Sequence, residues 1–139
     1  ILTERITGST WYVPGGRSTV AVMLRDAAAH YPFAADTHSG SLALPFESVL
    51  EKAGNADLWL IKYNASRPLT YADLLAEYRG YKALRAFKNQ QVFACNASVV
   101  PYFEETPFRP DLLLSDYVQL FHPEMRAKGA LRYFTPLTR

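Results

Sequence analysis

The feature that most constrains this chain is a short, almost unbroken apolar run, DLWLIKY, at residues 57–63. A run this short cannot cross a bilayer as a helix, and its Trp, Ile and Tyr are typical of a strand. A strand that is apolar on both faces needs cover on both faces. The run therefore predicts the central strand of a parallel sheet, with helices packed on each side.

The rest of the chain alternates as such a sheet requires. Short runs of strand-forming residues lie at 10–13, 31–35 and 91–95, and helical patterns separate them. We therefore expect a three-layer α/β fold, in which a mainly parallel sheet of about four strands has helices on both faces. The 139 residues suffice for one such domain, and we expect a single α/β lobe over residues 1–139.

Capping residues predict where the helices begin. Ser18 can cap a helix that ends before Tyr31. Pro45 suits the first position of a second helix, which places Glu47 in a first turn where the helix dipole favours a carboxylate. Pro110 opens the last substantial helix.

A third helix is predicted after Thr70, which can act as its cap. Its apolar stripe consists of Leu74, Tyr78, Tyr81, Leu84 and Phe87. After the last helix, the aromatic pair Tyr133 and Phe134 is expected to pack as a short extension.

Charge and cysteine content exclude several classes of protein. A formal net charge of +2 gives no reason to expect nucleic acid or an anionic membrane as a partner. The single cysteine, Cys95, rules out an internal disulfide and a cysteine-based zinc site. The aromatic content of 14% favours a surface that holds a ligand through rings, although an aromatic core explains it equally well.

Polar and aromatic residues gather in the loops that should follow the carboxyl ends of the strands, where an open parallel sheet binds its ligands. This rim comprises Arg17, His38, Asn64, Arg67, Asn96, Tyr102, Phe103, Glu104, Glu105 and Arg109. Such a set suits the binding of a bulky ligand better than catalysis.

Motifs of enzymes are absent from the sequence. The Gly15-Gly16 turn could hold a phosphate on its N–H groups, but it lacks the lysine and the spacing of a P-loop. The three histidines are scattered, and no GxSxG elbow occurs. We therefore expect no catalytic residue, no metal site and no cofactor. The alternative is an α/β enzyme domain, including a nucleotide-linked one, and a scaffold domain that binds only a partner protein is a third hypothesis.

The order of four segments resembles the second lobe of the periplasmic binding proteins that serve siderophore, haem and cobalamin importers. The segments are TWYVPGGRSTVAVMLRDAAAHYPF, SLALPFESVLEKAGNADLWLI, LRAFKNQQVFACNAS and FRPDLLLSDYVQLFHPE, and the resemblance covers about residues 7–134. It implies a solute-binding component of an ABC importer, with a metal chelate held between two α/β lobes. The chain would then be the C-terminal lobe, and its partners would be the chelate, the permease and a missing N-terminal lobe.

The resemblance also implies roles for individual residues. Glu47 matches the exposed glutamate through which such lobes dock on the permease. The ligand-binding positions would be Trp11, Tyr12, Arg17, His38, Asn96, Tyr102, Phe103 and Arg109.

The location that the resemblance implies is periplasmic or that of a cell-surface lipoprotein. The membrane would be reached only through the transporter or through a lipid anchor outside this chain. The sequence starts at Ile1 rather than Met, which suggests a piece of a longer chain.

Overall fold

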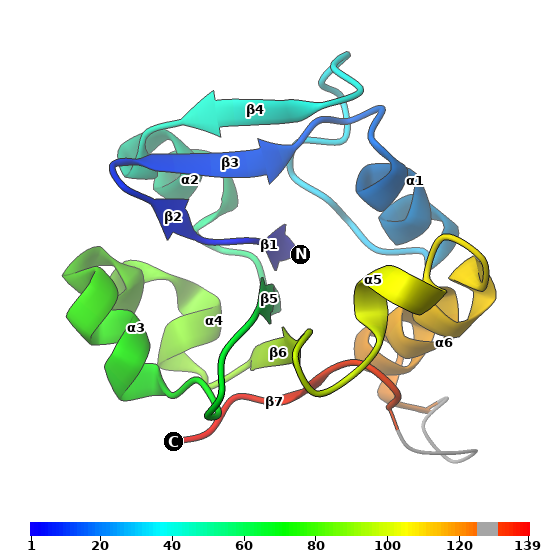
Figure 1. Cartoon of the computed structure of the whole chain (residues 1–139). Helices are drawn as coiled ribbons and strands as arrows, with labels where there is room; N and C mark the ends of the chain where they lie inside the picture. Colours follow the sequence, from blue (N-terminus) through cyan, green and yellow to red (C-terminus); the bar gives the residue numbers. More distant parts are fainter. Residues whose placement is uncertain (125–130) are drawn as a thin grey trace.

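A computed structural model of the chain describes residues 1–124 and 131–139 and contains two β-sheets surrounded by helices (Figure 1). The larger sheet has the strand order β1-β5-β6-β7. Its strands are β1 (Leu2–Thr3), β5 (Trp59–Tyr63), β6 (Val92–Asn96) and β7 (Thr135–Pro136). Strands β1, β5 and β6 are parallel, and β7 is antiparallel to β6. The predicted fold class, α/β with a mainly parallel four-stranded sheet, is confirmed.

Strand β5 is the central strand that the apolar run predicts. It lies between β1 and β6, with Trp59 in register with Leu2 on one side and Val92 on the other. Trp59, Leu60 and Ile61 are all buried. The buried run thus lies in the middle of the sheet and within its core.

The sequence does not predict the smaller sheet, which is antiparallel. It consists of β2 (Ile6–Thr7), β3 (Thr10–Pro14) and β4 (Ser41–Leu44), with β3 in the middle. The strand expected at 10–13 therefore exists, but its place in the parallel sheet is wrong. Gly8, with φ at +65°, lies in the tight turn from β2 to β3, and glycine adopts this conformation without strain.

The strand expected at 31–35 does not form. Hydrogen bonds from Ala34 N–H to the Tyr31 carbonyl and from Asp36 N–H to the Phe33 carbonyl fold this segment into turns. Tyr31 and Phe33 are nevertheless buried, and the Tyr31 hydroxyl donates to the Pro14 carbonyl. The apolar residues anchor a loop against the end of β3.

Helices cover both faces of the parallel sheet, as expected. They are α1 (Thr19–Asp26), α2 (Phe46–Ala53), α3 (Tyr71–Glu77), α4 (Arg85–Lys88), α5 (Tyr102–Glu105) and α6 (Pro110–Phe121), with a 3₁₀ helix, η1 (Arg79–Ala83). Figure 1 shows α3 and α4 on one side of the sheet, and α5 and α6 on the other with α1 beside α6.

The predicted caps are present. The Ser18 hydroxyl accepts the Ala21 N–H at 3.1 Å, and Thr70 forms a reciprocal capping box with Asp73. Pro110 is the first residue of α6. Pro45 is the N-cap of α2 rather than its first helical residue, one position from the expectation.

The long helix predicted after Thr70 is broken into three pieces. Tyr78 is extended, with φ at −159° and ψ at 114°, and its ring packs on Phe46 with 4.8 Å between the centroids. The ring also lies over Gly80, where an added Cβ would come within 2.3 Å of it. The stripe is still directed inward, because Leu74, Tyr81 and Leu84 are buried. Packing of Tyr78 has therefore overridden the helical period.

Five rings from separate elements form one cluster of contacting side chains. This aromatic cluster consists of Trp11, Phe46, Trp59, Tyr78 and Tyr81, with centroid separations from 4.8 to 6.3 Å. The cluster ties β3 of the small sheet to β5 of the large one.

The C-terminal segment packs as predicted, and a buried carboxylate holds it. Asp116, on α6, accepts N–H groups from Arg132, Tyr133 and Phe134 at 2.7 to 3.1 Å. Tyr133 and Phe134 are buried, and β7 follows them.

Candidate functional site

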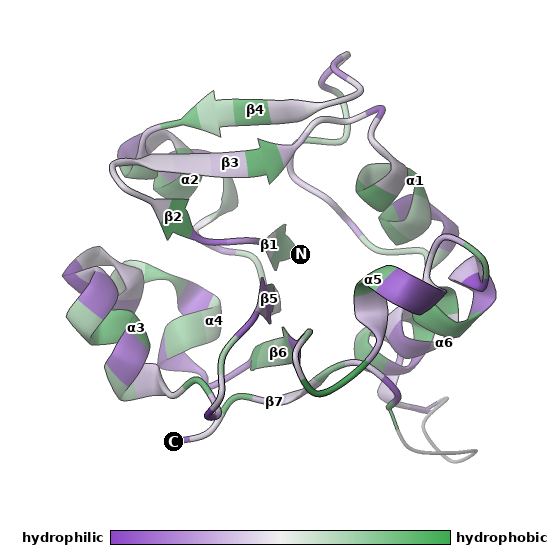
Figure 2. Ribbon diagram, viewed as in Figure 1, coloured by the Kyte–Doolittle hydropathy of each residue, from purple (hydrophilic) through white to green (hydrophobic). Residues whose placement is uncertain are grey.

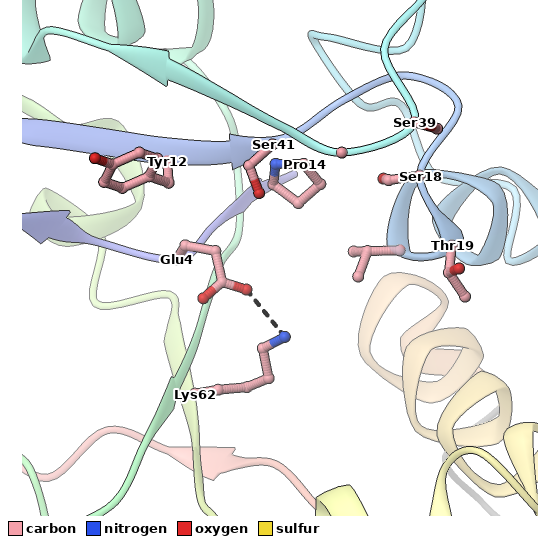
Figure 3. Close-up of a pocket in the computed structure, with 10 residues that line it drawn as sticks. Glu4, Tyr12, Pro14, Ser18, Thr19, Ser39, Ser41 and Lys62 are labelled. Atoms are coloured by element: carbon pink, nitrogen blue, oxygen red, sulfur yellow. Dashed lines mark ion pairs between the residues drawn. The ribbon is translucent and has the colours of Figure 1, made fainter.

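A groove of about 360 Å³ opens at the carboxyl ends of β1, β3 and β5 (Figure 3). We call it the carboxyl-end groove; it is lined by Glu4, Tyr12, Pro14, Ser18, Thr19, Val20, Ser39, Gly40, Ser41 and Lys62. A second hollow of about 270 Å³ adjoins it and is lined by Glu4, Lys62, Tyr63, Asn64 and Phe103. Because both include Glu4 and Lys62, this pair lies where the two hollows meet. The position agrees with the general rule that ligands of open α/β sheets bind beyond the carboxyl ends of the strands.

The pair itself is a half-buried salt bridge. Lys62 Nζ lies 3.1 Å from Glu4 Oε1, and the two side chains are 24% and 30% exposed. Figure 3 shows the two side chains directed toward each other from β5 and from the segment after β1. In Figure 2 that segment and the end of β5 are hydrophilic. The pair therefore places one positive and one negative charge where the two hollows meet.

Lys62 is held in its charged form. Burial alone would lower the pKa of its ammonium group, but attraction to Glu4 and the hydrogen bond between them outweigh this, so the pKa is raised. The ammonium also lies 5.3 Å from the centroid of the Tyr102 ring, within the range of a cation–π contact.

Glu4 has an unusual backbone that the core holds in place. Its φ is +65°, in the left-handed region that non-glycine residues seldom adopt, and such conformations gather at functional sites. Trp59 Nε1 donates to the Glu4 carbonyl at 2.7 Å, and Trp11 Nε1 donates to the Thr3 carbonyl at 3.0 Å. The Glu4 N–H donates to the Leu60 carbonyl at 3.1 Å. Two buried indoles thus fix the turn that presents the Glu4 carboxylate.

Two exposed rings line the hollows that meet at the Lys62–Glu4 pair. Tyr12 is 49% exposed and lines the carboxyl-end groove, and Phe103 is 62% exposed and lines the second hollow. Large exposed rings beside a charged pair suit a ligand that has both apolar and polar surface. The structure therefore brings together these two predicted positions, but leaves their contact with a ligand as a prediction.

The structure buries two of the predicted ligand-binding positions, Trp11 and Tyr102. Trp11 is fully buried in the aromatic cluster, because β3 turns alternate side chains to opposite faces and directs Trp11 inward and Tyr12 outward. Tyr102 is 5% exposed and packs beneath Lys62. Both rings therefore pack inside this lobe, and their expected contact with a ligand stays a prediction that this burial does not support.

Asn96 has its side-chain hydrogen bonds directed to neighbouring loops. Its Oδ1 accepts the Ser98 N–H at 3.1 Å and the Ala65 N–H at 3.3 Å, and its Nδ2 donates to the Ala65 carbonyl at 2.9 Å. Asn96 therefore joins the loop after β6 to the loop after β5, close to Asn64.

Arg17, His38 and Arg109 are exposed and line neither hollow. His38 Nδ1 lies 2.9 Å from Asp36 Oδ1, and this hydrogen bond is the largest cause of the lowered pKa of the Asp36 carboxyl. Arg109 makes a two-point contact with Asp111 at 2.8 and 3.0 Å. A ligand role for these three residues remains a prediction that the groove does not support.

The Gly15-Gly16 turn is not a phosphate cradle. The N–H groups of Gly15 and Arg17 donate to the Gly40 and His38 carbonyls at 2.7 and 3.0 Å, and the Gly16 N–H donates to Asp36 at 3.3 Å. The glycines are needed because a Cβ on Gly15 would lie 2.3 Å from the His38 carbonyl oxygen. These donors are therefore occupied by the loop before β4.

Within residues 1–124 and 131–139, no group of three or more His, Cys, Asp or Glu side chains is arranged to hold a metal ion. Over the same residues, no helix has the length and apolar character that a membrane span requires.

Sequence reasoning missed the two residues at the centre of the site, Glu4 and Lys62. Lys62 carried a usable signal, since it is the charged residue at the carboxyl end of the otherwise apolar strand β5. Glu4 gave no such signal, because its two-residue strand β1 is too short to be read from a pattern.

Glu47 lies where the sequence places it, in the first turn of α2. Its side chain is exposed, and among the residues that the structure describes its carboxylate has no hydrogen-bond or ion-pair partner. The carboxylate is therefore free to meet a partner molecule.

Comparisons with known proteins agree on the architecture. The chain superimposes on the TroA-like periplasmic binding protein FepB from Veillonella parvula with a TM-score of 0.60 and 18% identity, over 93% of this chain and 42% of that one. It superimposes on a periplasmic solute binding protein from Veillonella parvula DSM 2008 with a TM-score of 0.62 and 14% identity, over 94% of this chain and 38% of that one. At these identities the similarity establishes the fold.

A sequence relative is an uncharacterized lipoprotein of Methanocaldococcus jannaschii, 28% identical over 129 residues, which are 91% of this chain. The chain spans only 30% of that relative's length. No family model matches the chain.

Proposed function

We propose that residues 1–139 form the C-terminal lobe of a two-lobed solute-binding protein that delivers a metal chelate to an ABC importer. The observation that carries this proposal is the extent of the structural similarity. At least 93% of this chain matches periplasmic binding proteins, yet it accounts for no more than 42% of their length. A lobe of a two-lobed protein would give this proportion, and its ligand would lie between the carboxyl-end groove and a second lobe.

The groove supports binding rather than catalysis. Its charged residues, Glu4 and Lys62, form a pair with each other, and the N–H groups of the Gly15-Gly16 turn are occupied. The nucleotide-linked enzyme considered from the sequence therefore has no phosphate site at this turn. The groove is also open, as half of a shared cleft would be.

A location outside the cytoplasmic membrane fits the same proposal. Two structural neighbours are periplasmic proteins and the sequence relative is a lipoprotein. We propose that this protein is likewise periplasmic or held at the cell surface as a lipoprotein.

Binding by the full-length protein, compared with this lobe alone, tests the proposal. Calorimetry with haem, cobalamin and ferric siderophores should show clear binding of at least one chelate to the full-length protein and weak binding to residues 1–139. The lobe forfeits the contacts of the other half of the cleft, and large ligands need burial of most of their surface. Submicromolar binding by the isolated lobe would contradict the half-site, and absence of any chelate binding to the full-length protein would contradict the ligand class.

Glu47 is proposed as the permease-docking residue. Its exposed carboxylate at the start of α2 could form a charge-assisted pair with an arginine of the permease. In Glu47→Gln, chelate affinity of the full-length protein should stay unchanged while uptake through the transporter falls. Glu51→Gln is the matched control, because Glu51 is exposed one turn later on the same helix. Equal uptake by both variants would refute the assignment.

A further inference from the structure

The Lys62–Glu4 pair is the charged centre of the groove, and its donors are not all used. An ammonium group has three N–H donors. Glu4 Oε1 lies 3.1 Å from Nζ, and the face of Tyr102 lies beneath the ammonium. No further hydrogen-bond acceptor for Lys62 occurs among residues 1–124 and 131–139. Because Lys62 lines both hollows, a donor remains for a group inside them.

Lys62 is also the cation that the groove presents. Two arginines of the lobe are already paired: Arg109 with Asp111 at 2.8 Å, and Arg132 with Glu105 at 2.6 Å. Neither lines the two hollows, and among residues 1–124 and 131–139 Glu4 is the only carboxylate in the lining. The charge that a ligand meets in the groove therefore depends on whether Lys62 stays paired with Glu4 or turns to the ligand.

The backbone at both residues of the Lys62–Glu4 pair is held in place by the core. Trp11 and Trp59 fix the backbone on which Glu4 stands, and Lys62 belongs to the central strand β5. Preorganised donors bind better than mobile ones, because little conformational freedom is lost on binding. This rigidity distinguishes Lys62 from a surface lysine that makes an incidental salt bridge.

We infer that Lys62 determines the ligand specificity of the groove, donating to an anionic oxygen of the chelate, with Glu4 as the resident counter-ion that this oxygen must outcompete. The inference rests on the proposed function and narrows its substrate class. The preferred ligands are chelates with net negative charge, such as catecholate or carboxylate complexes, whose apolar parts contact Tyr12 and Phe103. Neutral chelates can accept a hydrogen bond from Lys62 but lack the attraction between the ammonium group and an anionic oxygen.

Two variants with opposite expected effects test the inference in the full-length protein. The probes are a ferric tris-catecholate, which is anionic, and a ferric tris-hydroxamate, which is neutral. Lys62→Met should weaken binding of the anionic complex by about tenfold or more, the loss expected for one charge-assisted hydrogen bond. Glu4→Gln should tighten binding of the same complex, because it removes the competing carboxylate. Affinity for the neutral complex should change little in either variant.

Lys82→Met supplies the control for net charge, since Lys82 is exposed on η1 and outside both hollows. It should leave both affinities as they are. Thermal unfolding of each variant checks that the lobe is folded.

If Lys62→Met binds the anionic complex as well as the unaltered protein does, or loses both complexes equally, the role of Lys62 as a charge selector is wrong. If Glu4→Gln weakens binding, the counter-ion role of Glu4 is wrong. If neither complex, haem nor cobalamin binds the unaltered full-length protein, the proposed chelate function fails and this inference fails with it.

Discussion

Trp11 and Tyr12 are neighbours in β3, but one is fully buried in the aromatic cluster and the other is 49% exposed in the carboxyl-end groove. Tyr102 and Phe103 repeat the contrast at the start of α5, with 5% and 62% exposure. The same type of side chain therefore serves the interior at one position and the surface at the next. Backbone geometry, not residue type, decides which role an aromatic residue takes.

The aromatic cluster and the carboxyl-end groove are also connected by hydrogen bonds. The indole N–H groups of Trp11 and Trp59 donate to the Thr3 and Glu4 carbonyls, so the cluster holds the turn that carries a groove carboxylate. The cluster should therefore affect both stability and binding, whereas Tyr12 and Phe103 should affect binding alone. The following predictions test this division.

The largest effect is expected from Trp11→Ala. Removing a fully buried indole leaves a cavity and an unpaired Thr3 carbonyl, and should lower the free energy of unfolding by about 3–5 kcal/mol. Tyr12→Ala, one residue away, should change it by only about 0.5 kcal/mol. Urea unfolding of the purified protein measures both. Similar losses in the two variants would contradict the contrast between cluster and groove.

A smaller loss is expected from Tyr81→Phe. The buried Tyr81 hydroxyl accepts the Ile6 N–H at 2.9 Å, and the change leaves that N–H without its acceptor. The free energy of unfolding should fall by about 1–3 kcal/mol, the cost of a buried unsatisfied donor. Tyr12→Phe serves as the comparison, since the Tyr12 ring is half exposed, and it should unfold at nearly the same urea concentration as the unaltered protein.

Tyr81 should also make stability fall at high pH. Burial raises the pKa of its hydroxyl from the ordinary value of about 10 to about 12, so the folded state keeps a proton that the unfolded state releases. This contribution is constant below pH 10 and is lost as the pH rises from 10 toward 12. The free energy of unfolding of Tyr81→Phe should decline less steeply over that range. The difference between the two slopes should correspond to the release of at most about one proton on unfolding. Parallel curves for the two proteins would show that the Tyr81 hydroxyl ionises freely in the folded state.

The smallest effect on stability is expected from Phe103→Ala. Its ring is 62% exposed, so the free energy of unfolding should change by about 0.5 kcal/mol or less. If Phe103 contacts the ligand, chelate affinity of the full-length protein should still fall. Calorimetry and urea unfolding on the same sample separate these two outcomes. A large stability loss would place Phe103 with the core residues.

Local signals in the sequence were sufficient for several elements. Ser18 and Thr70 cap their helices because a cap depends on residues only three positions apart. The run at 57–63 identifies β5 because burial on both faces leaves no polar positions.

Elements that depend on distant contacts could not be predicted in this way. β3 has the composition of a parallel strand, yet its register with β4 pairs Trp11 with Leu44, which is a contact far along the sequence. Tyr78 leaves the helical stripe to pack on Phe46. The site was affected most, because Glu4 reaches Lys62 only after β1 pairs with β5.

The parallel sheet has a consequence for the behaviour of the protein in concentrated solution. Its two outer strands, β1 and β7, are each two residues long, and β7 includes Pro136, which has no N–H to donate. Aggregation through sheets begins when a long edge strand offers a row of free N–H and C=O groups to another chain. Edges as short as these offer few such groups, so this sheet is poorly suited to grow by adding strands from neighbouring molecules. The apolar centre of β5, with Trp59, Leu60 and Ile61, is thereby shielded from intermolecular pairing.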